Sequence, residues 1–435
     1  MDMKENKENS YQVNEDPYQN SPVVDNDTQT KGGNIQFLNG IFTGIAACII
    51  VGAIAFSIWF FFGQHGNQNA ETEGINYQNV LNKLQLLEYY IDEQYLEEGE
   101  VANLEAGIYK GLLSGLEDPY STYYTSEEYD RLMESTNGVY YGIGAYVHQD
   151  TKTGVITIAK PFKDGPAYNA GVLPGDILYA VEGQEVTGMD LTSVVNLMKG
   201  KENTKVTITI LREGVTDPFD VIVVRGKVEV PTIEYEMMED SIGYIAVSEF
   251  DKITATQFRS AITDLESKGM KGLVIDLRDN PGGLLTSVVD MLDRMVKEGM
   301  LVYTKDKNGN GDEFKTSDSD YFDKPLAVLI NGNSASASEV FAGAIQDYGI
   351  GTLVGTTSYG KGIVQNIFPL NDGSAVKLTV SKYYTPNGRN IHGIGIEPDV
   401  EVELDEELKQ AVEISKSEDN QLQKAVEVVK EKLNQ

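Results

Sequence analysis

The chain has 435 residues, a length typical of about two to four domains, and 41% of its residues are hydrophobic. Its formal net charge of −32 disfavours binding to the phosphate backbones of nucleic acids. Cys48 is the single cysteine, which excludes an internal disulfide bond, a cysteine zinc site and an iron–sulfur cluster. The three scattered histidines argue against a catalytic zinc site.

The N-terminal segment is first polar and then strongly apolar. Residues 1–36 show no apolar periodicity, which predicts a disordered tail. Within residues 37–63, the run 41–62 carries no charge. As a helix rising about 1.5 Å per residue, this run is long enough to cross a hydrocarbon core of about 30 Å. The pattern therefore predicts one transmembrane helix.

A cleaved signal peptide is the alternative for this run. The run is too long for one, the tail before it is long, and no small-residue cleavage site follows. Lys31 lies before the run, whereas Glu71 and Glu73 follow it. This charge bias predicts a cytoplasmic tail, a single-pass anchor in the cell membrane and an extracytoplasmic main part.

Residues 75–135 show apolar side chains at a spacing of three and four, which predicts helices. Thr125 and Glu128 have the spacing of a capping box at the start of a third helix. We expect this region to serve in packing or dimerisation.

Residues 136–228 change to short strands and glycine turns. The N–H groups around Gly142, Ile143, Gly144 and Ala145 could form a nest for a carboxylate, and the strand that follows offers an edge for a peptide. A plain glycine-rich hairpin is the alternative. A Leu-Pro-Gly-Asp turn at 173–176, followed by a helix that Asp190 can cap, favours the first interpretation. This stretch resembles a PDZ domain of the bacterial protease-associated type, which binds free peptide C-termini.

Residues 229–400 alternate apolar strands with helices, which predicts an α/β fold with a largely parallel sheet covered on both faces. Residues 401–435 are charged and helix-prone, which predicts a C-terminal helical segment. The expected strands are 242–250, 273–277, 326–330 and 352–355, and the expected helices are one capped by Thr254, one near 284–296 and one over 339–348.

Two junctions between strand and helix carry residues suited to chemistry. The first, 276–283, ends in two glycines that let backbone N–H groups approach a ligand. The second, 331–339, holds three serines at the start of a helix, where the helix dipole stabilises an oxyanion. The simpler interpretation is that these serines only cap the helix.

A nucleophilic serine needs a base. Neither His148 nor His392 has a convincing aspartate partner, so a Ser-His-Asp triad is poorly supported. A lysine with a pKa lowered by burial can replace the histidine. Lys361 is the candidate, because it lies among small and apolar neighbours.

At this point the pattern over residues 75–400 resembles the C-terminal processing peptidases, which are serine proteases of family S41 with an inserted PDZ domain and a Ser-Lys dyad. The resemblance rests on several motifs. They are Asp118-Pro119-Tyr120-Ser121, Gly142-Ile143-Gly144, Leu173-Pro174-Gly175-Asp176, Asp276-Leu277-Arg278-Asp279-Asn280-Pro281-Gly282-Gly283, Ser334-Ala335-Ser336-Ala337-Ser338-Glu339, Tyr359-Gly360-Lys361-Gly362-Ile363-Val364-Gln365 and Tyr384-Thr385-Pro386-Asn387-Gly388. One departure is His392, where glutamine is more usual.

The resemblance implies a crotonase-like protease core over 229–400, a PDZ domain over 136–228 and a membrane-anchored serine endopeptidase. It implies Ser336 as nucleophile, Lys361 as base and Gln365 as the residue that orients Lys361. The N–H of Ala337, with that of Gly282 or Gly283, would hold the oxyanion.

The resemblance also implies protein or peptide substrates with free C-termini, bound by the PDZ domain, and no metal or organic cofactor. We expect the membrane as a further partner, no nucleic acid and a homodimer. Two other functions remain open. One is a catalytically silent PDZ scaffold, against which the intact serine, lysine and glutamine argue. The other is an acyl-CoA enzyme of the crotonase fold, which an extracytoplasmic location disfavours.

Overall fold

The computed structural model describes residues 74–97, 101–316, 320–409, 411 and 414–435. The tail 1–36 and the transmembrane helix expected within 37–63 lie outside these residues. Within the described ranges, no helix combines the length and the apolar character needed to cross a membrane. The chain divides into two compact units, Met1–Glu98 and Gly99–Gln435.

The described part of the first unit is helix α2 (Tyr77–Gln94). It begins at Asn76, whose side chain accepts a hydrogen bond from the N–H of Asn79. None of its residues is buried, and large apolar side chains such as Tyr77 and Leu81 are at least half exposed. The helix is therefore predicted correctly, and no described residue buries its apolar face.

The second unit begins with α3 (Val101–Ser114), β1 (Thr122–Tyr124) and α4 (Ser126–Asn137). The capping box of Thr125 and Glu128 is confirmed, and it starts α4. Strand β1 pairs antiparallel with β18 (Ala375–Tyr384), with Thr122 opposite Lys377. This pairing brings the turn at 118–121 to the side of β18.

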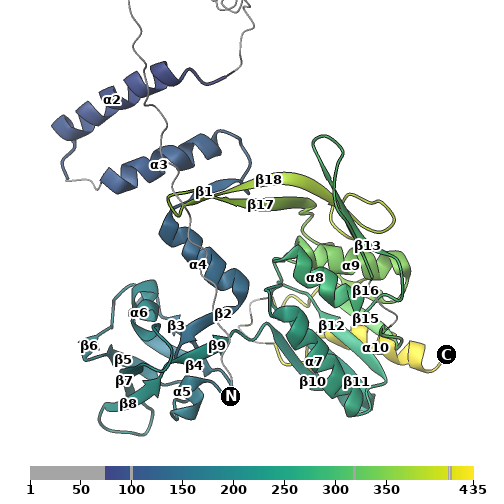
Figure 1. Cartoon of the computed structure of the whole chain (residues 1–435). Coiled ribbons are helices and arrows are strands. Elements are labelled where there is room, and N and C mark those ends of the chain that lie inside the picture. The colour runs from purple at the N-terminus through teal and green to yellow at the C-terminus, as the bar shows by residue number, and fades with distance from the viewer. Residues whose placement is uncertain (1–73, 98–100, 317–319, 410, 412–413) are drawn as a thin grey trace, which may run out of the picture. The chain divides into compact units, whose positions relative to one another are not determined.

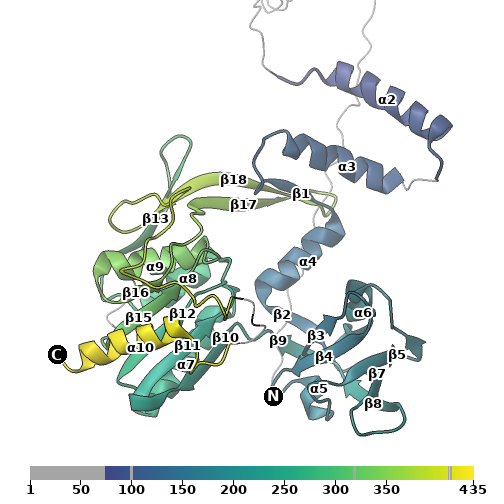
Figure 2. The ribbon, with the colours of Figure 1, turned by 180° about the vertical axis from the view of Figure 1, so that it is seen from behind.

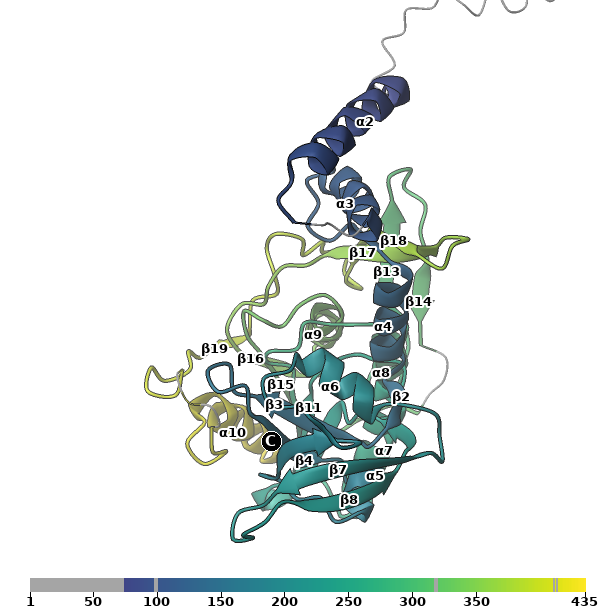
Figure 3. The same cartoon turned by 90° about the vertical axis from the view of Figure 1, so that its left-hand side faces the viewer.

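A separate small β domain follows, with its own hydrophobic core. Its main sheet has the order β3-β4-β5-β7-β8, and β2 and β9 form a separate two-stranded sheet (Figure 1). Figure 3 shows helix α4 leading into β2. Asp190 caps helix α6, as predicted, by accepting the N–H of Ser193. The elements are β2 (Val139–Gly142), β3 (Ala145–Gln149), β4 (Ile156–Pro161), α5 (Pro166–Asn169), β5 (Ile177–Val181), β6 (Gln184–Glu185), α6 (Leu191–Met198), β7 (Lys205–Leu211), β8 (Phe219–Val224) and β9 (Gly226–Glu229).

The remaining residues form a second sheet with the order β10-β11-β12-β15-β16-β19. All its pairs are parallel except β10-β11. Helices α7, α8 and α9 pack on one face and α10 packs on the other (Figures 1 and 2). The elements are β10 (Ile233–Met237), β11 (Ile242–Val247), α7 (Thr254–Ser267), β12 (Gly272–Asp276), α8 (Leu285–Asp293), β15 (Leu326–Ile330), α9 (Ala337–Tyr348), β16 (Thr352–Gly355), β19 (Val400–Glu401) and α10 (Asn420–Leu433).

A third sheet, with β13 (Met300–Asp306), β14 (Glu313–Lys315) and β17 (Ile363–Pro369), contains β18 at its centre.

Two local expectations are wrong. Thr254 does not cap α7 but begins it, because its hydroxyl accepts the N–H of Asp251 instead. The charged C-terminal segment is not one helix: Glu401 ends a strand, and the helix starts only at Asn420, where the side chain of Asp419 caps it.

Candidate active site

Ser336 lies in the turn between β15 and α9, directly before the first turn of the helix. Its backbone has φ 55° and ψ −111°, a conformation that a residue with a side chain rarely adopts. Such a conformation costs about 1–3 kcal/mol and persists only where neighbouring contacts enforce it. The side chain is half-buried, at the positive end of the helix dipole.

The two neighbouring serines are committed elsewhere. Ser334 is buried and donates to the carbonyl oxygen of Leu277 at 2.7 Å. Ser338 is also buried, and it donates to the carbonyl oxygen of Asn280 at 3.0 Å. Both hydroxyls therefore connect the turn 331–336, which we call the serine turn, and the start of α9 to the loop 276–283.

Glu339 is the buried residue that joins Ser336 to Lys361. One carboxylate oxygen, Oε2, accepts the backbone N–H of Ser336 and that of Lys361, each at 2.8 Å. The other oxygen accepts the N–H of Gly360 at 2.7 Å and the hydroxyl of Ser358 at 2.6 Å. One carboxylate thus fixes the distance between the two segments.

Tyr383, on β18, also joins the main chains of Ser336 and Lys361. Its phenolic oxygen lies 2.9 Å from the carbonyl oxygen of Ser336 and also contacts the carbonyl oxygen of Lys361. Burial raises the pKa of Tyr383 well above its usual range, so the phenol stays protonated and can donate. The main chains of Ser336 and Lys361 are therefore held together on two sides.

The Lys361 amine lies in a setting that favours its neutral form. Burial lowers the pKa of Lys361, and the positive charge of Lys377 lowers it further. The carboxylates of Asp118 and Glu339 act in the opposite direction but are smaller influences. Among the described residues, the amine makes no hydrogen bond or ion pair, and it lies 4.4 Å from the centre of the Tyr120 ring.

The loop 276–283 supplies the candidate donors for an oxyanion. The N–H of Gly282 donates to Asn280 Oδ1 at 2.9 Å and is therefore occupied. Those of Gly283 and Ala337 have no intramolecular acceptor within the described part of the chain. Of the predicted alternatives, Gly283 with Ala337 is thus the pair free to bind an anion.

A cavity of about 130 Å³ lies beside Ser336 and the candidate oxyanion donors, and Lys361 is not among the residues that line it. It is lined by Gly283, Leu284, Leu285, Ser336, Ala337, Val340, Ile363, Val364, Gln365 and Tyr383. Gln365 therefore faces the same space as Ser336. Its amide nitrogen lies 3.4 Å from Thr379 Oγ1, and no hydrogen bond within the described ranges joins it to Lys361.

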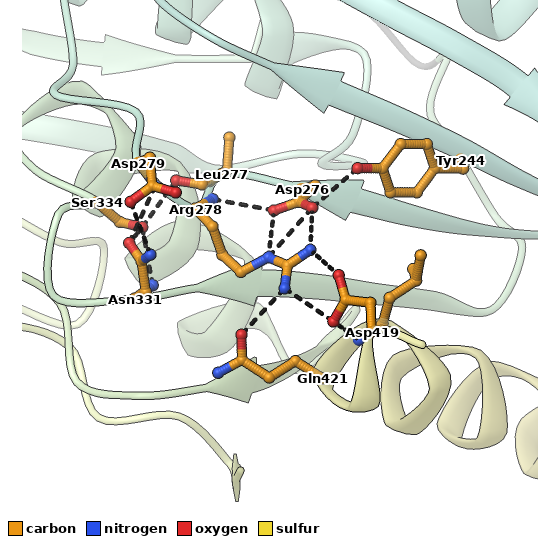
Figure 4. Close-up of polar contacts among 10 residues, drawn as sticks. Tyr244, Asp276, Leu277, Arg278, Asp279, Asn331, Ser334, Asp419 and Gln421 are labelled. Carbon is orange, nitrogen blue, oxygen red and sulfur yellow. Dashed lines mark hydrogen bonds and ion pairs between the residues drawn. The ribbon is translucent and has the colours of Figure 1, made fainter. Parts of the chain in front are cut away.

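A largely buried arginine anchors the start of the loop 276–283 (Figure 4). Arg278 donates to both oxygens of Asp276 and both oxygens of Asp419, and also to Gln421. Asp419 precedes α10, so this network connects the C-terminal helix to the loop. Further along, Asp279 Oδ1 accepts the side-chain amide of Asn331, which ties the loop to the serine turn.

In the small β domain, several backbone groups of the predicted carboxylate-binding loop 142–145 already have hydrogen-bond partners. The carbonyl oxygens of Ile143 and Gly144 accept the N–H groups of Ala167 and Phe162. The N–H groups of Ala145 and Gly144 face the Tyr140 hydroxyl, whose pKa burial raises to about 12 while these donors oppose the rise. Gly142 ends strand β2 and lies against the Tyr140 ring. To bind at Gly144 and Ala145, the carboxylate of a substrate would therefore have to displace the Tyr140 hydroxyl.

Neither histidine named as an alternative base lies at this cavity. His148 is exposed on β3 of the small β domain, and the side chain of His392 is exposed as well. Sequence reasoning gave no role to Glu339, Tyr383 or Tyr120. Glu339 could have been found, because it stands three residues after Ser336, at the spacing of a capping box. Tyr120 stands in one of the motifs of the resemblance, but nothing in that motif indicates a contact with Lys361, and Tyr383 carries no local signal.

Comparison with known proteins gives two matches to family models. Residues 241–402 match peptidase family S41, and residues 157–212 match the PDZ domain. A carboxy-terminal-processing protease of Bartonella bacilliformis is 40% identical over 316 residues, which are 71% of this chain and 72% of that protein. The carboxy-terminal processing protease CtpA of Bacillus subtilis is 34% identical over 362 residues, covering 83% and 77% of the two chains.

Among solved structures, that of a photosystem II D1 C-terminal processing protease is similar to this chain. Its sequence is 30% identical, and the match covers 74% of this chain and 86% of that one, with a TM-score of 0.43.

Proposed function

Because this chain belongs to peptidase family S41, we propose that it is a membrane-anchored serine endopeptidase that cleaves protein substrates near their C-termini. Ser336 is the nucleophile and Lys361 is its base. The PDZ domain binds the substrate C-terminus, and the apolar run 41–62 anchors the chain in the cell membrane with the protease part extracytoplasmic.

In the proposed mechanism, neutral Lys361 accepts the proton of the Ser336 hydroxyl as the serine oxygen attacks the scissile carbonyl carbon. The carbonyl oxygen becomes an oxyanion that accepts hydrogen bonds from the N–H groups of Gly283 and Ala337. The ammonium of Lys361 then donates its proton to the leaving amine. A water molecule hydrolyses the acyl-enzyme and restores both residues.

The observation that carries this proposal is the shared acceptor, Glu339 Oε2, of the N–H groups of Ser336 and Lys361. It explains how a serine and a lysine from separate segments stay aligned without a direct hydrogen bond between their side chains. The commitment of Ser334 and Ser338 to carbonyl oxygens supports the choice of Ser336 among the three serines.

The test is proteolysis by the full chain, in detergent or vesicles, against a protein with a free apolar C-terminus. Ser336→Ala and Lys361→Ala should each abolish cleavage, because the two residues act as one unit. Ser334→Ala serves as the matched control. It removes the hydrogen bonds that the Ser334 hydroxyl makes with Leu277 and Asn331, costs about 1–3 kcal/mol of stability and should retain most activity.

Full activity in Ser336→Ala would exclude the proposed nucleophile. A chain that binds C-terminal peptides but cleaves none would be the silent PDZ scaffold instead.

A further inference from the structure

The turn 118–121 has no role in the mechanism above, although it is part of the family resemblance. Its shape is set by Asp118, whose carboxylate accepts the N–H of Tyr120 at 3.0 Å and the hydroxyl of Ser121 at 2.5 Å. The Ser121 hydroxyl in turn accepts the N–H of Thr379 on β18 at 3.0 Å. The turn is thus fastened to a central strand, and it holds the Tyr120 ring in one direction.

That direction is toward Lys361. The Lys361 amine lies over the face of the Tyr120 ring, 4.4 Å from its centre. The Tyr120 hydroxyl lies 3.5 Å from that of Tyr359, which comes two residues before Lys361. The hydrogen bond to Tyr359, together with burial, raises the pKa of Tyr120 to about 12, so the ring stays uncharged over the working range.

A ring in this position has two effects on a lysine that alternates between amine and ammonium. Its bulk keeps water from the nitrogen, which favours the neutral amine. Its π face attracts the ammonium, the form that the neutral base takes once the serine proton has moved to it. An interaction that strengthens in the transition state raises kcat, whereas one present equally in the ground state does not.

We propose that Tyr120 is a positioning residue for Lys361: the Tyr120 ring fixes the direction of the amine and stabilises the ammonium formed by proton transfer. This proposal rests on the proposed function, because it presumes that Lys361 is the base. The proposal gives the turn 118–121 a role in supporting the base. This role is not evident from the sequence, because the turn lies far along the chain from Ser336 and Lys361.

The charges that face Lys361 come from three elements. Lys377 on β18 disfavours the ammonium, whereas Asp118 in the turn and Glu339 on α9 favour it. The ring acts in addition to these charges. Substitutions of Tyr120 leave all three in place, so their effects can be assigned to the ring.

Three substitutions of Tyr120 in the full chain separate the two effects. Tyr120→Phe keeps the bulk and the π face, Tyr120→Leu keeps apolar bulk only, and Tyr120→Ala removes both. The measurements are kcat, KM and the pH at which kcat/KM falls on the acid side. Tyr303→Leu is the control, because Tyr303 contacts a different amine, that of Lys305.

We expect Tyr120→Phe and Tyr303→Leu to behave like the parent protein. Tyr120→Leu should move the acid limb to lower pH by about half a unit to one unit, and should lower kcat about three- to tenfold with little change in KM. Tyr120→Ala admits water and should move the acid limb to higher pH. Opposite shifts from leucine and alanine are not expected of a residue that only supports the fold.

A second readout does not need activity. In Ser336→Ala protein, competitive acylation of the Lys361 amine as a function of pH, quantified by mass spectrometry, reports its proton equilibrium directly. The pH midpoint of acylation is expected to follow the same order: lowest in Tyr120→Leu, unchanged in Tyr120→Phe and highest in Tyr120→Ala.

Identical profiles for Tyr120→Phe and Tyr120→Leu in both readouts would overturn the positioning role. Activity retained by Ser336→Ala or Lys361→Ala would overturn the proposed function, whatever Tyr120 does.

Discussion

Gly282 lies so close to Ser336 that a Cβ at Gly282 would come within 2.8 Å of the Ser336 Cβ. It would also lie 3.0 Å from the backbone nitrogen of Ala337, one of the two candidate oxyanion donors. The backbone of Gly282 has φ +107°, which strains any residue with a side chain. The loop 276–283 and the serine turn are thus packed backbone against backbone.

Gly282→Ala should therefore displace Ser336 and lower kcat/KM about a hundredfold, since a shift of about 1 Å in a reacting group has that effect. Gly332→Ala is the matched control in the serine turn, because an added Cβ there meets nothing closer than 4.0 Å. Steady-state kinetics of both variants checks the prediction. Equal activity in the two would contradict the close packing.

Glu339→Gln should reduce activity and stability together. The amide keeps the size of the side chain but replaces one accepting oxygen with a donor, so two of its four donors lose their acceptor. Each buried donor left without a partner costs about 1–3 kcal/mol. Denaturant unfolding measures the loss. Glu397→Gln on the surface should leave both properties unchanged, and a Glu339→Gln protein of parental stability would refute the bridging role.

The pH dependence follows from the direction of the Lys361 pKa. The proposed base must be neutral, so activity should rise as pH increases through the Lys361 pKa, which lies below the usual lysine value because of burial. Lys377→Met removes a positive charge that disfavours the ammonium. It should raise the Lys361 pKa and move the acid limb of kcat/KM to higher pH by up to about one unit.

Lys305→Met is the control for Lys377→Met, because Lys305 contacts Tyr303 and Tyr384 and is not among the charges that act on Lys361. A shift of the Lys377→Met profile to lower pH would mean that another group limits activity on the acid side.

Substrate choice should depend on a free C-terminus. A carboxylate at Gly144 and Ala145 accepts charge-assisted hydrogen bonds of about 1.5–3 kcal/mol each, and an amide does not. Amidating the C-terminus of a substrate peptide should therefore slow cleavage about tenfold or more below saturation. Tyr140→Phe removes the hydroxyl that these N–H groups face and should lower KM for the acid peptide more than for its amide. Equal cleavage rates for the acid and amide peptides would contradict carboxylate binding at Gly144 and Ala145.

Local chemistry made most of the sheet predictable from sequence. The strands Leu326–Ile330 and Thr352–Gly355 are predictable to the residue, because each apolar run is too short for a helix and is bounded by turn residues. The helix expected from Glu339 starts two residues earlier, at Ala337, because the small residues before Glu339 carry no period. The expected strand 242–250 ends at Val247, since Phe250 turns away to bond with the loop at Gly282 and Leu284.

The site was predictable only where a residue type implies its chemistry. Ser336 and Lys361 could be proposed from the sequence because a nucleophile and a base are chemically conspicuous. Their alignment could not, because it depends on Glu339 Oε2 and on Tyr383, which acts from a distant strand. The choice between Gly282 and Gly283 likewise needed the position of the Asn280 side chain.

The central claim, that Ser336 is the nucleophile and Lys361 its base, is tested most directly by covalent labelling. A fluorophosphonate reacts with an activated serine, and peptide mass spectrometry identifies the labelled residue. We predict a single label on Ser336 that is absent in Ser336→Ala and at least a hundredfold slower in Lys361→Ala, as expected for members of one catalytic unit. A label on Ser334 or Ser338, or an unchanged rate in Lys361→Ala, would contradict the account.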